Sequence, residues 1–221
     1  QGARGGPGSR CGQFLIDSSS TTYARPVRWD RLFDDLEAQA SAEWEAERAA
    51  LASESERVRL SRVSLRDRLL VLRDAQAQVR VQLSGGAGVE GRIVAVGADW
   101  LAVDRGPSSV SIVPLGGLTG LRMAHADLLH SASGRVGQAL RERMDLGFVL
   151  RDLARRRVPV LVELVADDAL TGTVDRAGAD HFDLAIHDLD VPRHPSAVTG
   201  FRMVPFGALA QLVVAAGDAG L

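Results

Sequence analysis

The chain has 221 residues, a formal net charge of −2 and a single cysteine, Cys11. The sequence contains 26 arginines, no lysine and no asparagine. These absences exclude a Walker-type phosphate loop and Schiff-base catalysis, which need a lysine, and N-glycosylation, which needs an asparagine. One cysteine also excludes an internal disulfide and a multi-cysteine metal site.

The composition is typical of a globular protein, since 46% of the residues are hydrophobic and 24% are charged. No uninterrupted apolar run approaches the roughly 18 residues that a membrane-spanning helix needs. We therefore expect a cytoplasmic protein that has no contact with a membrane.

A helical arm is predicted over residues 27–63, after a glycine- and serine-rich tail over 1–26 that we expect to be disordered. One face of the arm carries apolar residues at steps of three and four: Trp29, Phe33, Leu36, Ala40 and Trp44. Residues 30–56 contain nine acidic residues and two arginines, whereas residues 57–68 contain five arginines and one acidic residue. Such a helix either pairs antiparallel with a second copy or packs on its own domain with a solvated charged face.

A first β-rich domain is predicted over residues 64–124. Ser64 and Asp67 have the spacing of a capping box, which indicates a short leading helix over about 65–76. A period of two begins at Val79, and strand-like segments separated by glycine-rich turns follow at 79–83, 89–96, 99–104, 109–113 and 117–122. Five short strands over about 45 residues favour a small antiparallel barrel.

A second copy of this unit is predicted over 134–217, after a polar linker over 125–133. Its leading helix is predicted over residues 134–157 and is expected to end before Pro159. A shift of 81 residues superposes Gly91 on Gly172 and the Gly97–Asp99 turn on Gly178–Asp180. After a ten-residue insertion, Val113–Leu118 superposes on Val204–Leu209, and twelve positions are identical in all. The two domains are therefore expected to share one fold.

This repeated unit resembles the Sm-like family over 65–123 and 146–216. The resemblance rests on the glycine at the end of an apolar-x-Gly segment, on the Gly-Ala-Asp turn before an apolar strand, and on the last apolar segment with its tight turn: Val89–Gly91, Gly97–Val103 and Ile112–Leu118, with their repeats. It implies an α+β fold in which the N-terminal helical arm is followed by two helix-led, five-stranded Sm-like (SH3-like) small β-barrels. It also implies a ring-forming homo-oligomer that binds RNA.

The architecture also resembles an uncharacterised family of high-GC Gram-positive bacteria, through the Arg-Trp-Asp-x-Leu-Phe-x-Asp-Leu-Glu segment at 28–37. Some members are labelled Fis-like transcriptional regulators. Such a regulator would need a C-terminal helix-turn-helix, whereas the C-terminus of this chain is predicted to be a strand.

The best candidates for nucleic-acid contacts are Arg151, Arg155, Arg156 and Arg157, at the end of the second leading helix. Arginine forks suit phosphate oxygens, although cations at a helix C-terminus also complement its dipole. Trp100 is a candidate base-stacking platform or, alternatively, a packing residue. Trp100 occupies the position at which Sm-like proteins that bind RNA have an asparagine. At the position of their Arg-Gly pair, this chain has Leu115-Gly116.

His181, Asp183 and His187 alternate along a predicted strand, which puts them on one face. An exposed polar strand face gives the same pattern as a metal site, so neither a metal nor another cofactor is predicted. No catalytic motif is present, and we expect a non-enzyme. Two hypotheses remain: an oligomer that binds RNA in a regulatory role, or an assembly or adaptor module whose partner is protein.

Overall fold

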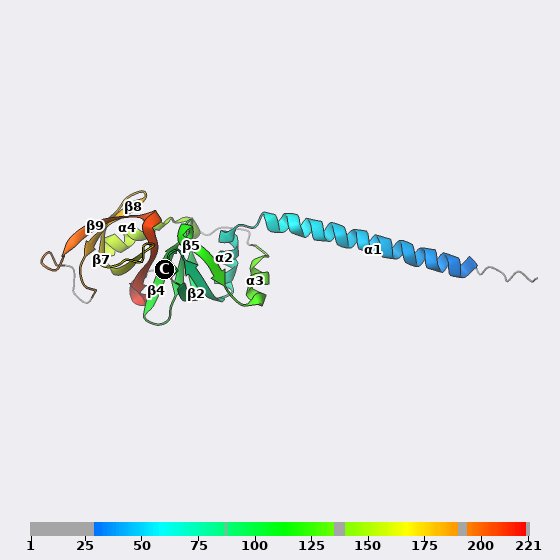
Figure 1. Ribbon diagram of the computed structural model, residues 1–221, viewed down its shortest axis with the longest axis horizontal. Helices are drawn as coiled ribbons and strands as arrows, with labels where there is room; N and C mark the ends of the chain where they lie inside the picture. Colours follow the sequence, from blue (N-terminus) through cyan, green and yellow to red (C-terminus); the bar gives the residue numbers. More distant parts are fainter. Residues whose placement is uncertain (1–28, 87, 135–139, 190–193, 220–221) are drawn as a thin grey trace, which may run out of the picture. The chain divides into compact units, whose positions relative to one another are not determined.

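The computed structural model describes residues 29–86, 88–134, 140–189 and 194–219 (Figure 1). The tail predicted to be disordered, residues 1–26, lies outside the described residues. The chain divides into two units with the boundary after Ser53. None of the described helices is long and apolar enough to cross a bilayer.

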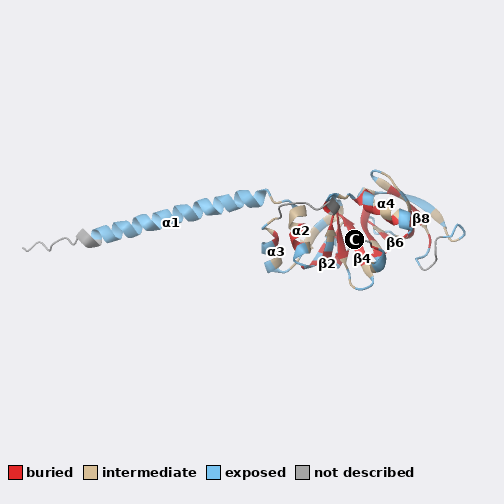
Figure 2. Cartoon of the chain, turned by 180° about the vertical axis from the view of Figure 1, so that it is seen from behind, coloured by how far each residue is buried: buried red, intermediate tan, exposed pale blue. Residues whose placement is uncertain are grey.

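The predicted helical arm is present as α1 (Trp29–Ser61), a helix of 33 residues. It contains no glycine or proline, so nothing in its backbone interrupts the hydrogen-bond ladder. Every described side chain from position 32 to 61 is exposed, as Figure 2 shows. The apolar side chains of α1 from position 32 onward are therefore exposed.

Helix α2 (Leu65–Asp74) begins at the predicted capping box. The Ser64 side chain accepts a hydrogen bond from the Asp67 backbone N–H, and the Asp67 carboxylate binds back to Ser64. These bonds satisfy backbone donors that the first helical turn leaves open. The helix then buries Leu69, Leu70 and Leu72 against the strands that follow.

Ten strands among the described residues form one antiparallel sheet. In chain order they are β1 (Gln78–Leu83), β2 (Gly88–Val96), β3 (Trp100–Asp104), β4 (Ser109–Pro114), β5 (Leu118–Arg122), β6 (Pro159–Leu164), β7 (Ala169–Ala177), β8 (His181–Ile186), β9 (Gly200–Pro205) and β10 (Leu209–Ala215). Their order across the sheet is β5-β1-β2-β3-β4-β10-β6-β7-β8-β9.

The prediction of two closed five-stranded barrels is therefore wrong. A barrel needs its outer strands to pair with each other, yet β4 pairs with β10, a strand of the second repeat, and β5 and β9 are the edges of an open sheet. The period of two identifies strands and their buried faces, but it carries no information on where an outer strand finds its second partner. The strands were predictable from this pattern, whereas closure was not.

The predicted repeat is confirmed in the pairing register. We call α2 with β1–β5 the first half, and α4 with β6–β10 the second half. In the first half Val79 pairs with Gly91, and Leu101 with Val113; in the second, Val160 pairs with Gly172, and Phe182 with Val204. The register shift in the last strand also recurs. Each half is thus one unit with the same internal pairing.

Three helical segments differ from the prediction. Helix α3 (His125–Ser131) occupies most of the predicted polar linker, and the helix predicted over 134–157 is replaced, within the described residues, by the 3-10 turn η2 (Leu140–Arg143) and helix α4 (Leu146–Arg156). The Asp145 side chain caps α4 by accepting from the Phe148 N–H at 2.7 Å. Short 3-10 turns η1 (Leu115–Gly117), η3 (Phe206–Ala208) and η4 (Ala216–Asp218) complete the fold.

The two halves share a core at their junction. Antiparallel pairing of β4 with β10 sets Ile112 opposite Leu212 and Val110 opposite Val214. Four side chains of the first half belong to the core of the second, together with the buried face of α4: Trp100, Ala102, Val110 and Ile112. The first half keeps a separate core beneath α2. The junction is therefore made by strand pairing and by apolar burial together.

Candidate functional site: sheet edges, groove and arginine cluster

The predicted arginine cluster surrounds the C-terminal end of α4, where two of its members share one carboxylate. Asp152 accepts from Arg155 at 2.5 Å and from Arg156 at 2.7 Å. The Arg155 bond, followed by the weaker influence of Arg156, holds the pKa of the Asp152 carboxyl below its usual value. These two guanidinium groups are therefore engaged within the helix.

The other two arginines have separate surroundings. Arg151 lies 3.5 Å from the Asp145 carboxylate that caps the helix. Arg157 is the C-cap residue, with a left-handed backbone at φ 52°, and it is exposed. The cluster thus interleaves with two carboxylates, which reduces the local positive potential that phosphate binding requires.

Arg156 contributes more to stability than its neighbour Arg155, because its Nη1 donates a hydrogen bond to the Asp218 carbonyl at 2.7 Å. We expect Arg156→Ala to lower the free energy of unfolding by about 1 kcal/mol, the typical value of one such bond. Arg155→Ala, which breaks only a surface ion pair, is expected to cost less than about 0.5 kcal/mol. Urea denaturation of both variants measures the difference, and equal losses would contradict this assignment.

Trp100 lies in the junction core and not on the surface. Its side chain is only 3% exposed, and its indole N–H donates to the Met144 carbonyl at 3.0 Å. Neither ring face is open to a base in this position, so packing, the alternative interpretation, describes its environment. RNA binding by the chain as a whole stays an untested prediction.

The three residues predicted to alternate along one strand are not gathered into a metal site: His181 and Asp183 lie in β8, and His187 follows its last residue. His187 is buried and donates from Nδ1 to its neighbour's carbonyl, while its Nε2 lies 2.7 Å from the Thr173 hydroxyl. His181 Nδ1 lies 2.8 Å from an Asp180 carboxylate oxygen, and this hydrogen bond lowers the pKa of Asp180. Within the described ranges, no three potential ligands approach closely enough to hold a metal ion.

The edge strand β9 exposes two large apolar side chains that sequence reasoning did not single out. Phe201 is 68% exposed and Met203 is 65% exposed. Both follow from the repeat, because a shift of 91 residues superposes them on Val110 and Ile112, which are buried in the junction. The alignment of the two halves already showed that the four positions are equivalent. Only the structure shows that β4 lies inside the sheet and β9 at its edge.

The opposite edge of the sheet lies beside an apolar groove of about 320 Å³. Its walls come from α2, β5 and α3, and most of its lining is aliphatic: Leu65, Leu69, Leu72, Leu118, Leu121, Met123 and Leu128. Arg68 ties two walls together, since it donates to the Ser131 hydroxyl and the Leu128 carbonyl. The hydrogen bonds of Arg68 thus hold α2 and α3 together on either side of the groove.

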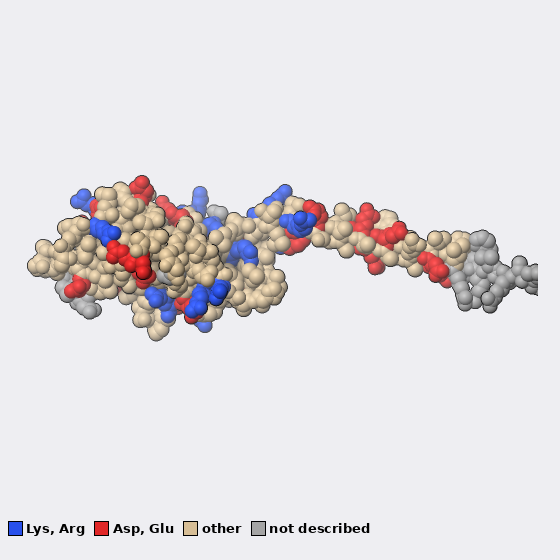
Figure 3. All heavy atoms as spheres, viewed as in Figure 1, with Lys and Arg blue, Asp and Glu red and all other residues tan. Residues whose placement is uncertain are grey.

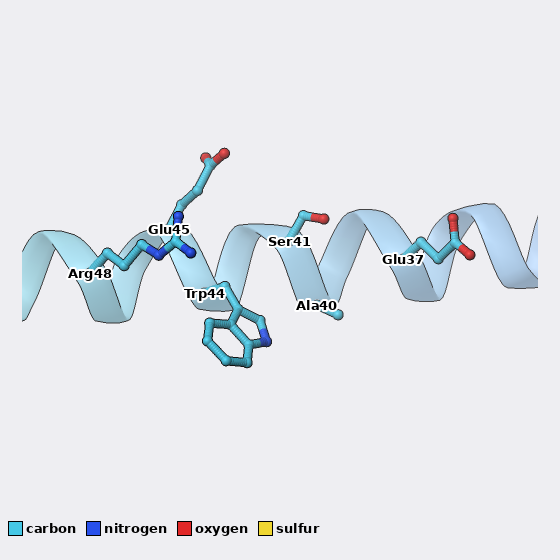
Figure 4. A pocket seen from close by; sticks show the side chains of 6 residues that line it. All are labelled: Glu37, Ala40, Ser41, Trp44, Glu45 and Arg48. Carbon is cyan, nitrogen blue, oxygen red and sulfur yellow. The ribbon is translucent and has the colours of Figure 1, made fainter.

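Helix α1 presents a third apolar surface. Trp44 is 64% exposed and Leu51 is 66% exposed. Figure 4 shows Trp44 and Ala40 on one side of the helix, with Ser41 and Glu45 on the other. The acidic side chains along α1 and the arginines near its C-terminal end are visible in Figure 3. Antiparallel pairing of two arms, one of the two alternatives drawn from the charge pattern, remains untested.

Comparison with known proteins assigns no family. No protein-family model matches the chain, and no curated protein matches it significantly. The resemblances drawn from the sequence therefore stay predictions.

Proposed function

We propose that the chain is a non-enzymatic assembly protein that joins its sheet edge to edge with further copies of itself, in the cytoplasm. One observation supports this most: the chain already contains such a contact, between β4 of one half and β10 of the other. The repeat equivalents of these two strands are β9 and β5, and both lie at the edges of the sheet that the described residues form. An exposed edge is a template for pairing with another chain.

The internal contact also specifies the register of the external one. Leu212 opposite Ile112 becomes, after the shift of 91 residues, Leu121 of one copy opposite Met203 of the next. The same register sets Arg122 opposite Arg202, whose guanidinium is 2.6 Å from Asp168. Like charges across a strand pair weaken it, so we expect association to strengthen as salt screens them.

The proposed contact is heterologous, because β5 and β9 are different surfaces. Each added copy leaves one β5 edge and one β9 edge free for the next. Such head-to-tail contacts close into a ring or continue as a filament, depending on the rotation between neighbours. In both cases one repeated junction extends the sheet from copy to copy. As an adaptor, the assembly would present the surfaces outside the junctions in multiple copies to a partner.

Cysteine cross-linking tests the proposed register. Leu121→Cys with Met203→Cys, in a chain that also carries Cys11→Ser, is expected to form disulfide-linked multimers on mild oxidation. Opposite residues on adjacent strands bring their Cβ atoms within roughly 4.5–5.5 Å, which is close enough for a disulfide after small shifts. A ladder of multimers on a non-reducing gel is the expected result.

The matched control moves one cysteine by a single position. Leu121→Cys with Arg202→Cys puts the two thiols on opposite faces of the proposed sheet, because side chains alternate along a strand. It is expected to stay monomeric on the same gel. Equal cross-linking of both pairs, or of neither, would count against edge-to-edge assembly in this register.

Nucleic-acid binding is not part of this proposal. Two of the four predicted arginines share Asp152, and the Trp100 ring is buried. Neither observation favours a phosphate-binding surface at the end of α4.

A further inference from the structure

We infer that Phe201 and Met203 of one copy fill the groove between α2, β5 and α3 of the next. We call this side-chain contact the lock, and it favours pairing with a second copy of this chain over pairing with strands of other proteins. The inference rests on the proposed function and adds the side-chain contacts to the backbone pairing.

At the internal junction, the face of β3 and β4 is covered by the second half. Val110 and Ile112 join the core that includes Leu146, Leu150 and Leu153 of α4. The repeat equivalents of the three leucines are Leu65, Leu69 and Leu72 of α2, and all three line the groove. The groove is thus the first-half counterpart of the surface that Val110 and Ile112 fill.

Burial differs from the internal junction at the rim of the groove, because Leu69 and Leu72 at its floor are already buried within the described chain. Leu146 is almost fully buried at the junction, whereas its equivalent Leu65 is 50% exposed. Val110 and Ile112 are buried, whereas their equivalents Phe201 and Met203 are exposed. Burial of exposed apolar side chains stabilises a contact, so removal of Phe201, Met203 and Leu65 from water favours association of the two copies.

A third element of the junction has an equivalent at the free ends. The Asp99 carboxylate accepts from the Leu146 N–H at 2.8 Å, which ties the turn before β3 to the N-terminus of α4. The corresponding residues are Asp180, whose side chain is 88% exposed, and Leu65 at the start of α2. In the assembled protein Asp180 of one copy reaches the Leu65 N–H of the next.

The free end differs from the internal junction at two positions, and both differences weaken the contact between copies. Trp100 and Ala102 of the internal junction correspond to His181 and Asp183 at the free end. Polar side chains there bury less apolar surface and cost desolvation. The contact between copies is therefore weaker than the contact between halves, so copies exchange while the halves stay together.

The test is Phe201→Ser with Met203→Ser in the full chain, studied by sedimentation velocity over a range of concentrations. We expect association to weaken by at least about 100-fold, because residues at the centre of an interface carry most of its free energy. The unfolding midpoint of the dissociated chain should stay close to that of wild-type monomer, because both side chains are exposed before association. Leu65→Ser, on the opposite wall of the contact, is expected to weaken association in the same way.

The matched control is Phe148→Ser on α4, an exposed apolar residue outside the groove and outside both edge strands. It is expected to leave association unchanged. If this α4 variant weakens association as much as the β9 variant does, the inference is overturned, because the effect then does not depend on the proposed contact. If the β9 variant associates like wild type and the disulfide ladder still forms in register, the lock is wrong while edge pairing stands; a monomeric wild-type protein overturns both.

Discussion

Gly172→Ala is expected to destabilise the second half by on the order of 3 kcal/mol, at the upper end of what an overpacked site costs. A Cβ at this position would lie 2.0 Å from the Ala185 carbonyl oxygen, where the backbones of β7 and β8 approach each other. The obstacle is backbone and not a flexible side chain, so the strands themselves must move apart. Chemical denaturation monitored by circular dichroism measures the loss.

The repeat supplies both a replicate and a control for this prediction. Gly91, the equivalent residue, would place its Cβ 1.9 Å from the Asp104 carbonyl oxygen, and Gly91→Ala should be about equally costly. Gly207 and its own equivalent Gly116 have nothing within 4 Å of an added Cβ. Gly207→Ala is expected to change stability by less than about 0.5 kcal/mol. Similar losses at Gly172 and Gly207 would show that close strand approach is not what requires the glycine.

Trp100→Ala is the second substitution with a large expected effect, on the order of 3–5 kcal/mol. It removes the largest side chain that the first half contributes to the junction core, and it leaves the Met144 carbonyl without the indole donor. Trp100→Phe keeps most of the apolar volume and should cost about half as much. Urea denaturation of both variants gives the two values.

The control for this prediction is Trp44→Ala, whose ring on α1 is exposed. It is expected to change stability by less than about 0.5 kcal/mol. A small loss on Trp100→Ala, comparable to the α1 control, would contradict the assignment of Trp100 to a junction core that holds the two halves together.

The sequence predicted the parts of the fold that local patterns carry. The period of two located the strands, the Ser64–Asp67 spacing located the start of α2, and the shift of 81 residues predicted that the two halves pair alike. Helix α3 was missed because it spans only about two turns and lies in a polar segment. A periodicity needs more residues than that to stand out from its surroundings.

Closure of the sheet and the environment of the candidate residues were beyond the reach of these patterns. Whether β4 pairs with β5 or with β10 is a competition between two tertiary contacts, and the alternation of side chains is the same in both. The burial of Trp100 follows from that choice, because the second half covers the face on which it lies. Asp152, by contrast, was within reach, since its spacing to Arg155 and Arg156 is that of helical ion pairs.

The central claim is that the free edges of this sheet join copies of the chain as β4 and β10 join its halves. Sedimentation velocity of the wild-type protein across micromolar concentrations tests it most directly. We predict species whose masses are multiples of one chain, with a fraction that rises with concentration and with salt. A single species with the mass of one chain at every concentration and salt would contradict the claim.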